Sequence, residues 1–225
     1  MYRIVKENTE GVVEEKVYGV LIDFDLASRT QHLAKDYTRT SQQRTGTPPY
    51  MAYGLLNGSD GRHLYRHDLE SLFYIMLIVA THYEIQLPTG GKSGGLRTRQ
   101  GFKELPYELW FNQPSYKTLA SFKATLITTR TGFDLSPSFK NFRGWLMSLR
   151  HSFWRGFRYK QDQDCDFELA QSREEGEGSE GQGMPTFDEE TLGGHINYSA
   201  LINPVRELKG ELEGLIIRYD RPPLT

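Results

Sequence analysis

The chain has 225 residues, a net charge of −2 and 37% hydrophobic residues, enough for one large domain or two small ones. Its single cysteine, Cys165, excludes an intrachain disulfide and a cysteine-based zinc site. It also suits a reducing compartment, so we expect an intracellular protein of the cytoplasm or nucleus. The longest apolar run, residues 72–80, is too short to cross a bilayer, and residues 1–6 show no secretory leader. We therefore expect no membrane partner.

The charge is unevenly distributed. Residues 161–183 carry eight acidic residues and one arginine, whereas the rest of the chain has 26 basic and 21 acidic residues. This basic surplus is too diffuse to indicate nucleic-acid binding. The expected macromolecular partner is a protein.

Two short strands are predicted at the N-terminus, at residues 1–5 and 16–22, joined as a hairpin by a polar loop. The second strand ends in Asp23-Phe24-Asp25. A carboxylate at the end of a buried strand suits a hard cation or a phosphate-bound metal. The alternative is that Asp23 and Asp25 are ordinary turn residues.

Residues 26–50 have no hydrophobic period and end in Pro48-Pro49, which predicts a long irregular loop. Loops of this length inside compact domains are usually functional or disordered. A glycine-rich segment, residues 88–101, is predicted to be a second, flexible loop.

Apolar spacing predicts four helices in the body of the chain. The first, residues 66–83, is apolar nearly all round and should be buried. The other three are a short helix within 102–111 that carries Trp110, a helix marked by Leu119, Phe122, Leu126 and Ile127, and the strongest amphipathic helix, which Ser136-Pro137 begins and whose stripe runs from Phe139 to Phe157.

The chain is expected to have three parts. Residues 1–160 form the main domain, and the acidic residues 161–183 form a disordered linker. Residues 184–225 form a C-terminal segment, whose helix should start at Asn203-Pro204 and pack on the body.

Two short patterns resemble known binding motifs but do not indicate a site. Gly91-Lys92-Ser93 resembles the end of a phosphate-binding P-loop, but Gln86 stands where the first glycine belongs and no strand-to-helix context surrounds it. His63 and His67 are four residues apart, but the residues between them supply no general base of the zinc-protease kind.

Three motifs follow one another along the chain: Asp23–Ala27 (DFDLA), Gly46–Ala52 (GTPPYMA) and His67–Ser71 (HDLES). Their order resembles the C-terminal lobe of protein kinases, and most closely the fungal-type protein kinase family. That family has Asp-aromatic-Asp-Leu-Ala, Gly-Thr-Pro-Pro-aromatic-Met-Ala and His-Asp-Leu-Glu-Ser at these places. Asp134–Phe139 and Thr191–His195 also resemble family segments.

The resemblance implies ATP and magnesium as cofactors and phosphoryl transfer to Ser or Thr of a protein. Asp23 would bind the magnesium, and Phe24 would pack inward. Asp68 would be a buried structural anchor that holds the amides of the catalytic loop. Capping of the helix by Asp68 is the simpler alternative, and the two roles are compatible.

The resemblance also makes the loop an activation segment that doubles as a substrate loop, with Thr47 facing the catalytic acid and favouring Ser or Thr substrates. Phosphorylation would order this segment through Arg29, Arg39 or Arg44. The segment includes Phe24, Asp25, Gly46, Thr47 and Pro48, and its candidate phosphorylation sites are Thr38, Thr40, Ser41 and Thr45. The alternative is an ordinary polar loop.

Several parts of a working kinase are absent from the 225 residues: a His-Arg-Asp catalytic loop, the Asn that holds the second magnesium, a Gly-rich loop over the phosphates, and a strand lysine paired with a helix glutamate. We interpret this as truncation at the N-terminus, so the chain alone should be inactive. In addition, Gly54 stands where kinases usually have a glutamate that pairs with an arginine. Candidates for that arginine are Arg143, Arg150 and Arg155.

The expected fold class is therefore α+β and mainly α, a kinase-like C-terminal lobe with a short hairpin. Two other functions stay open. One is a non-catalytic, pseudokinase-like interaction module. The other, a small-molecule phosphotransferase on the same fold, is disfavoured by the long segment that ends in Gly46–Pro49.

Overall fold

The computed structural model describes residues 2–9, 12–19, 46–58, 63–86, 95–99, 105–112, 115–174 and 187–207, without side-chain surroundings for 2–19, 171, 173–174 and 204–207. The chain divides into two units, Met1–Gln43 and Arg44–Thr225. The described ranges are mainly α-helical and contain two separate two-stranded sheets. This confirms the expected mainly helical α+β class. No helix in these ranges has the length and apolar character to cross a bilayer.

The first unit contains the predicted hairpin. Strands β1 (Tyr2–Thr9) and β2 (Val12–Gly19) pair antiparallel, from Tyr2 opposite Gly19 to Thr9 opposite Val12. The hairpin is confirmed, although both strands extend further into the predicted polar loop than expected. Residues 20–22, predicted to end the second strand, lie outside the described residues.

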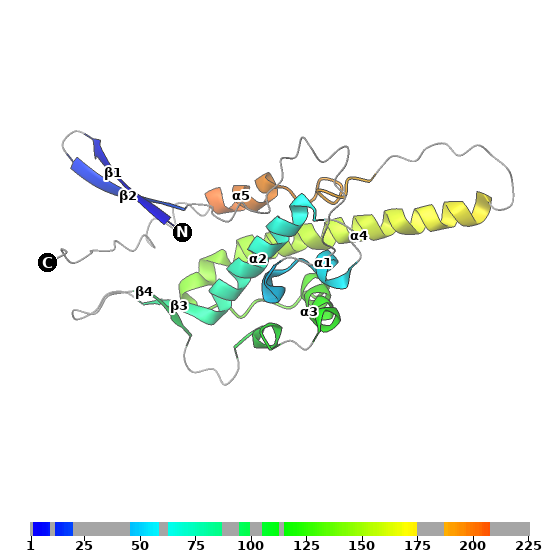
Figure 1. Cartoon of the computed structure of the whole chain (residues 1–225), viewed down its shortest axis with the longest axis horizontal. Coiled ribbons are helices and arrows are strands. Elements are labelled where there is room, and N and C mark those ends of the chain that lie inside the picture. Colours follow the sequence, from blue (N-terminus) through cyan, green and yellow to red (C-terminus); the bar gives the residue numbers. More distant parts are fainter. Residues whose placement is uncertain are drawn as a thin grey trace. The chain divides into compact units, whose positions relative to one another are not determined.

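The second unit is organised around helix α2 (Tyr65–His82), which the apolar period predicted within one residue at each end. Leu69, Phe73, Leu77 and Ala80 recur at helical spacing and are buried. The helix contacts α4 (Arg143–Glu174) and the short α1 (Tyr53–Asn57), so it lies inside the unit, as Figure 1 shows.

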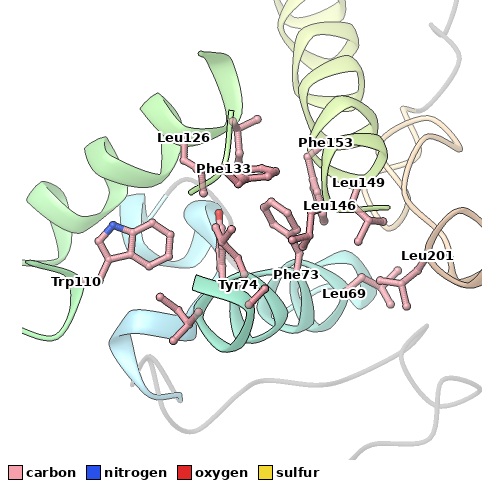
Figure 2. Packing of buried hydrophobic residues seen from close by; sticks show 14 of the residues in the cluster. Leu69, Phe73, Tyr74, Trp110, Leu126, Phe133, Leu146, Leu149, Phe153 and Leu201 are labelled. Carbon is pink, nitrogen blue, oxygen red and sulfur yellow. The ribbon is translucent and has the colours of Figure 1, made fainter. Parts of the chain in front are cut away.

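Phe73 occupies the centre of the core. Its ring centroid lies 5.8 Å from that of Phe153 on α4 and 6.4 Å from that of Phe133. Figure 2 shows these rings meeting between the helices, with Leu146 and Leu149 beside them. Burial of these large side chains stabilises the packing of α2 against α4.

Helix α3 (Tyr116–Thr128) closes the other side of the core. Ser115 caps its start, since the Ser115 hydroxyl accepts a hydrogen bond from the Thr118 amide at 3.1 Å. The short helix predicted within 102–111 is a three-residue 3-10 turn, η3 (Glu108–Trp110), and Trp110 is buried as expected.

The second sheet corrects the predicted flexible loop at residues 88–101. Strands β3 (Tyr83–Gln86) and β4 (Gly95–Thr98) pair antiparallel, so the prediction is wrong for Gly95–Thr98. Composition alone missed this strand because its stability comes from backbone pairing with β3. Residues 87–94 and 100–104 lie outside the described residues.

The amphipathic helix that Ser136-Pro137 was predicted to begin starts as a 3-10 segment, η4 (Pro137–Phe142), and continues as α4. Helix α4 reaches Glu174, so the prediction of a disordered linker is wrong for residues 161–174. This extension is almost entirely exposed. The extension contains the good helix formers Gln, Glu, Leu, Ala and Arg, and Arg158 and Asp162 pair across one turn at 3.9 Å at its start. Residues 175–183 lie outside the described residues.

The C-terminal segment packs on α4. Helix α5 (Tyr198–Glu207) begins five residues before Asn203, because Asn197 accepts a hydrogen bond from the Ala200 amide at 2.8 Å and caps it there. Trp145 on α4 donates its indole N–H to the Leu201 carbonyl at 2.7 Å. Residues 208–225 lie outside the described residues.

Phe73→Ala tests the core. The substitution should lower the free energy of unfolding by about 3–5 kcal/mol, because it leaves a cavity among rings that cannot close over it. Urea unfolding measures the change. Leu72→Ala is the matched control, since Leu72 is 37% exposed on the same helix and should cost less than about 1 kcal/mol. Equal losses from the two substitutions would contradict this core.

Candidate functional site

The sequence-predicted site residues divide into two groups. Asp23, Phe24 and Asp25 and the candidate phosphorylation sites Thr38, Thr40, Ser41 and Thr45 lie outside the described residues. Their predicted roles stay predictions. Within the described ranges, no three His, Cys, Asp or Glu side chains are arranged to hold a metal ion. Gly46, Thr47, Pro48 and Asp68 are described.

Residues 46–58, called the Gly46 segment below, form a compact turn and a short helix. Gly46 has a backbone φ of 131°, a conformation that residues other than glycine rarely adopt. The Thr47 carbonyl then accepts hydrogen bonds from the amides of Tyr50 (2.9 Å) and Met51 (3.2 Å), forming the 3-10 turn η2 (Pro48–Tyr50). Gly46 and Thr47 are exposed, whereas Pro49 is buried. The segment therefore presents its first residues to solvent and anchors the following ones.

Lys123 of α3 holds the middle of this segment. Its side chain is fully buried, and its amine donates to the carbonyl of Pro49 at 3.0 Å and to the carbonyl of Met51. The amine also lies 3.8 Å from the ring centroid of Tyr74 and 5.1 Å from that of Trp110. Two carbonyls and two aromatic faces thus replace part of the water that this amine loses on burial.

Glu70 of α2 holds the end of the same segment. One of its carboxylate oxygens, Oε1, accepts hydrogen bonds from the Tyr53 amide (2.7 Å) and the Tyr74 hydroxyl (2.5 Å). The Tyr53 amide is at the start of α1, where the helix has no internal partner for it. Glu70 therefore fixes both the position and the first turn of α1. In Figure 2 the Tyr74 hydroxyl points from α2 into the space below α3.

Burial dominates the electrostatics of this cluster. It lowers the pKa of the Lys123 amine from 10.5 to about 7, and the nearby Glu70 carboxylate opposes part of the shift. Burial and then the Glu70 charge raise the pKa of Tyr74 well above 10, so the phenol stays protonated and donates to Glu70. The second Glu70 oxygen, Oε2, is buried without a hydrogen-bond partner among the described residues.

Sequence reasoning assigned no role to Glu70 and did not single out Lys123. One signal was available for Lys123. It lies four residues after Leu119 and three before Leu126, so a charged residue occurs in the apolar stripe of a predicted helix. A buried charge needs partners, but the sequence does not show that these are main-chain carbonyls.

Asp68 is not the buried residue that was predicted. Its side chain is 72% exposed, and its carboxylate meets the His63 ring nitrogen Nε2 at 2.9 Å. The helical period explains the exposure, because Asp68 lies on the same face of α2 as exposed Leu72 and Ile75. Its predicted role as an anchor for a catalytic loop stays a prediction, since this chain contains no such loop. Its bond to His63 lies just before the first turn of α2.

Gly54, at the place of the usual kinase glutamate, is buried within α1. The structure shows the surroundings of the three arginines that were candidates to pair with that glutamate. Arg143 and Arg155 are exposed. Arg150 is buried, donates to the Thr131 carbonyl and lies 4.7 Å from the Phe133 ring centroid. Burial lowers the pKa of Arg150, and Tyr107 opposes this shift.

Comparison with known protein families gives one match. Residues 4–80 match the model of the family described as fungal protein kinase. This range is about a third of the chain, and it includes all three of the motifs. The match confirms the resemblance inferred from the three motifs. Comparison with curated proteins and comparison with solved structures both give no match.

The range that matches the fungal protein kinase family contains all but the first two residues of β1, the whole of β2 and of the Gly46 segment, and all but the last two residues of α2. Glu70 therefore lies inside the matched range and Lys123 outside it. The kinase-family segment and its lysine anchor come from different parts of the chain and meet through the fold.

The buried lysine predicts a dependence of stability on pH. In the unfolded chain the amine should titrate near 10.5, and in the folded protein near 7. Between these values the unfolded chain binds more protons, so the free energy of unfolding should rise with pH. Below about pH 7 the Lys123 amine is protonated in both the folded and the unfolded state, so it no longer makes the free energy of unfolding depend on pH.

Lys123→Met should remove this rise, as measured by urea unfolding from pH 6 to 10. Lys117→Met is the control, because Lys117 is an exposed lysine on the same helix and should leave the rise intact. Parallel pH profiles for the wild type and Lys123→Met would show that the amine is not buried.

Proposed function

We propose that this chain is the C-terminal lobe of a fungal-type protein kinase, and that the longer protein transfers the γ-phosphoryl group of ATP to Ser or Thr of a protein. The observation that carries the proposal is the fungal protein kinase match at residues 4–80, which includes both the Asp23 motif and the Gly46 segment. Glu70, inside the matched range, and Lys123, outside it, hold the Gly46 segment, and Thr47 is exposed.

The roles in the reaction divide as follows. Asp23 would hold magnesium, which would neutralise charge on the nucleotide phosphates. The Gly46 segment would receive the substrate polypeptide, with Thr47 next to the acceptor hydroxyl. Thr38, Thr40, Ser41 and Thr45 would regulate the segment when phosphorylated. The base that orients the acceptor hydroxyl would come from a catalytic loop outside these 225 residues.

The second candidate function is a non-catalytic interaction module. The observation that favours it is that the sequence has no His-Arg-Asp motif, and we identify in it neither a Gly-rich loop of the nucleotide-binding kind nor a strand lysine that pairs with a helix glutamate. In this case the Gly46 segment would be a binding surface with no phosphoryl transfer. The two candidate functions differ in one expectation: a polypeptide extended upstream would bind MgATP and transfer phosphate if it is a kinase, and would do neither if it is an interaction module.

The experiment compares nucleotide binding by two polypeptides, the present chain and one extended upstream until it includes a His-Arg-Asp loop. A ligand at 100 times its Kd stabilises by about 2.7 kcal/mol, which corresponds to roughly 5–10 °C in Tm. We expect MgATP to raise the Tm of the extended polypeptide by this amount and to leave that of the present chain within about 1 °C.

Two further results decide between the candidates. Asp23→Asn in the extended polypeptide should abolish the Tm shift, because it removes the anionic metal ligand. Transfer of labelled γ-phosphate to a Ser/Thr protein should follow the same pattern. An extended polypeptide that shows neither a shift nor transfer would contradict the kinase proposal and favour the interaction module.

A further inference from the structure

Two buried groups of opposite charge hold one short stretch of main chain from two sides. Lys123 comes from α3 and Glu70 from α2, and they contact residues 49–53 at three backbone atoms: the carbonyls of Pro49 and Met51 and the amide of Tyr53. Both side chains are fully buried. We call this pair the Glu70–Lys123 clamp.

Helix packing alone does not account for the clamp. Burying two charges is costly, and apolar side chains of similar volume often serve packing equally well or better. Among the described residues, both hydrogen bonds of the Lys123 amine go to the Gly46 segment. Glu70 divides its bonds between the segment and Tyr74. What the amine and the carboxylate add is therefore a fixed path for residues 49–53.

The clamp lies where an expected interaction is missing. Kinases usually pin this end of the segment by a glutamate–arginine pair, but here the glutamate position is Gly54, and Arg150 contacts Thr131 and Phe133 instead. The Tyr53 amide, which Glu70 fixes, directly precedes Gly54. Gly54 has no carboxylate with which to pin this end of the segment. The carboxylate of Glu70 binds the main chain one residue earlier, at Tyr53.

We propose that Glu70 and Lys123 are positioning residues that hold residues 47–53 as a preformed platform for the polypeptide substrate, in place of the ion pair lost at Gly54. This inference rests on the proposed kinase function. The platform includes the exposed Thr47 and the partly buried Tyr50, whose ring contacts that of Phe111 with centroids 6.0 Å apart. Preforming this surface lowers the conformational entropy lost when a peptide binds.

The decisive variant is the double substitution Glu70→Leu/Lys123→Met. It removes both charges together and keeps their volume, so no buried charge is left unpaired and the fold should survive. We expect amides in residues 50–53 to exchange with deuterium about five- to tenfold faster, because their anchoring hydrogen bonds are lost. Exchange of α4 amides in the same sample should not change, which excludes global unfolding.

Tyr74→Phe is the matched control. It removes the other hydrogen bond to Glu70 but leaves the bonds to residues 49–53, so exchange in the segment should stay at the wild-type rate. Unchanged exchange at residues 50–53 in the double variant would overturn the clamp. Equal acceleration in Tyr74→Phe would show that loosening of the core, and not the clamp, controls the segment.

The pH dependence of hydrogen exchange tests the part played by the Lys123 amine. Side chains that only fill space would leave this pH dependence unchanged. Opening of the segment exposes the Lys123 amine to water, so the closed state binds fewer protons than the open state above about pH 7. After correction for intrinsic exchange, protection of residues 50–53 should increase from pH 7 to pH 9 in the wild type. It should be flat in the double variant, where neither Glu70 nor Lys123 can titrate.

A kinetic measurement connects the clamp to the substrate. In the extended polypeptide, the double variant should raise the KM for a Ser/Thr peptide about tenfold and leave kcat and the KM for ATP within about twofold. If the double variant transfers phosphate with an unchanged KM for the peptide, the positioning role of Glu70 and Lys123 is overturned. Absence of transfer in the wild type would overturn the kinase proposal and with it the substrate role, whereas the exchange result would still establish or refute the clamp by itself.

Discussion

The arrangement of the second unit depends on one constraint: a fully buried lysine must find partners that replace water. Lys123 finds them in the carbonyls of Pro49 and Met51, in the faces of Tyr74 and Trp110, and in the charge of Glu70. These partners belong to the Gly46 segment, α2 and η3, so satisfying this one amine of α3 brings four elements to the same place. The aromatic core beside it then excludes water and strengthens these interactions.

The other buried cations follow the same rule. Arg150 on α4 donates to the carbonyl of Thr131, and Arg66 on α2 donates to the carbonyl of Glu189 at 2.9 Å. In each case a helix presents the charge and a non-helical segment supplies the main-chain oxygen. Main-chain oxygens are available at turns, where helices and strands leave them unpaired. Buried charge in this chain thus fixes connecting segments onto a helical core, and the Gly46 segment is the one that carries the family motif.

The sequence predicts the helical framework well because apolar residues at three- and four-residue spacing mark α2, α3 and the start of α4. It fails where stability comes from partners distant in sequence. Strand β4 depends on pairing with β3, and the exposure of Asp68 depends on which face of α2 the core takes. The acidic stretch 161–174 was taken for a linker on composition, although an exposed helix tolerates the same composition. For the candidate site, the motifs located the Gly46 segment, whereas the residues that hold it were invisible because their partners are backbone atoms 17 and more residues away.

The clamp therefore depends on the burial of one amine against two carbonyls, in the field of a nearby carboxylate. An NMR titration of the Lys123 amine, assigned by its loss in Lys123→Met, measures this directly. Burial of the amine should lower its folded-state pKa well below 10.5, towards about 7. A pKa near 10.5 would contradict the dominance of burial at this amine, on which the predicted pH dependence of the clamp rests.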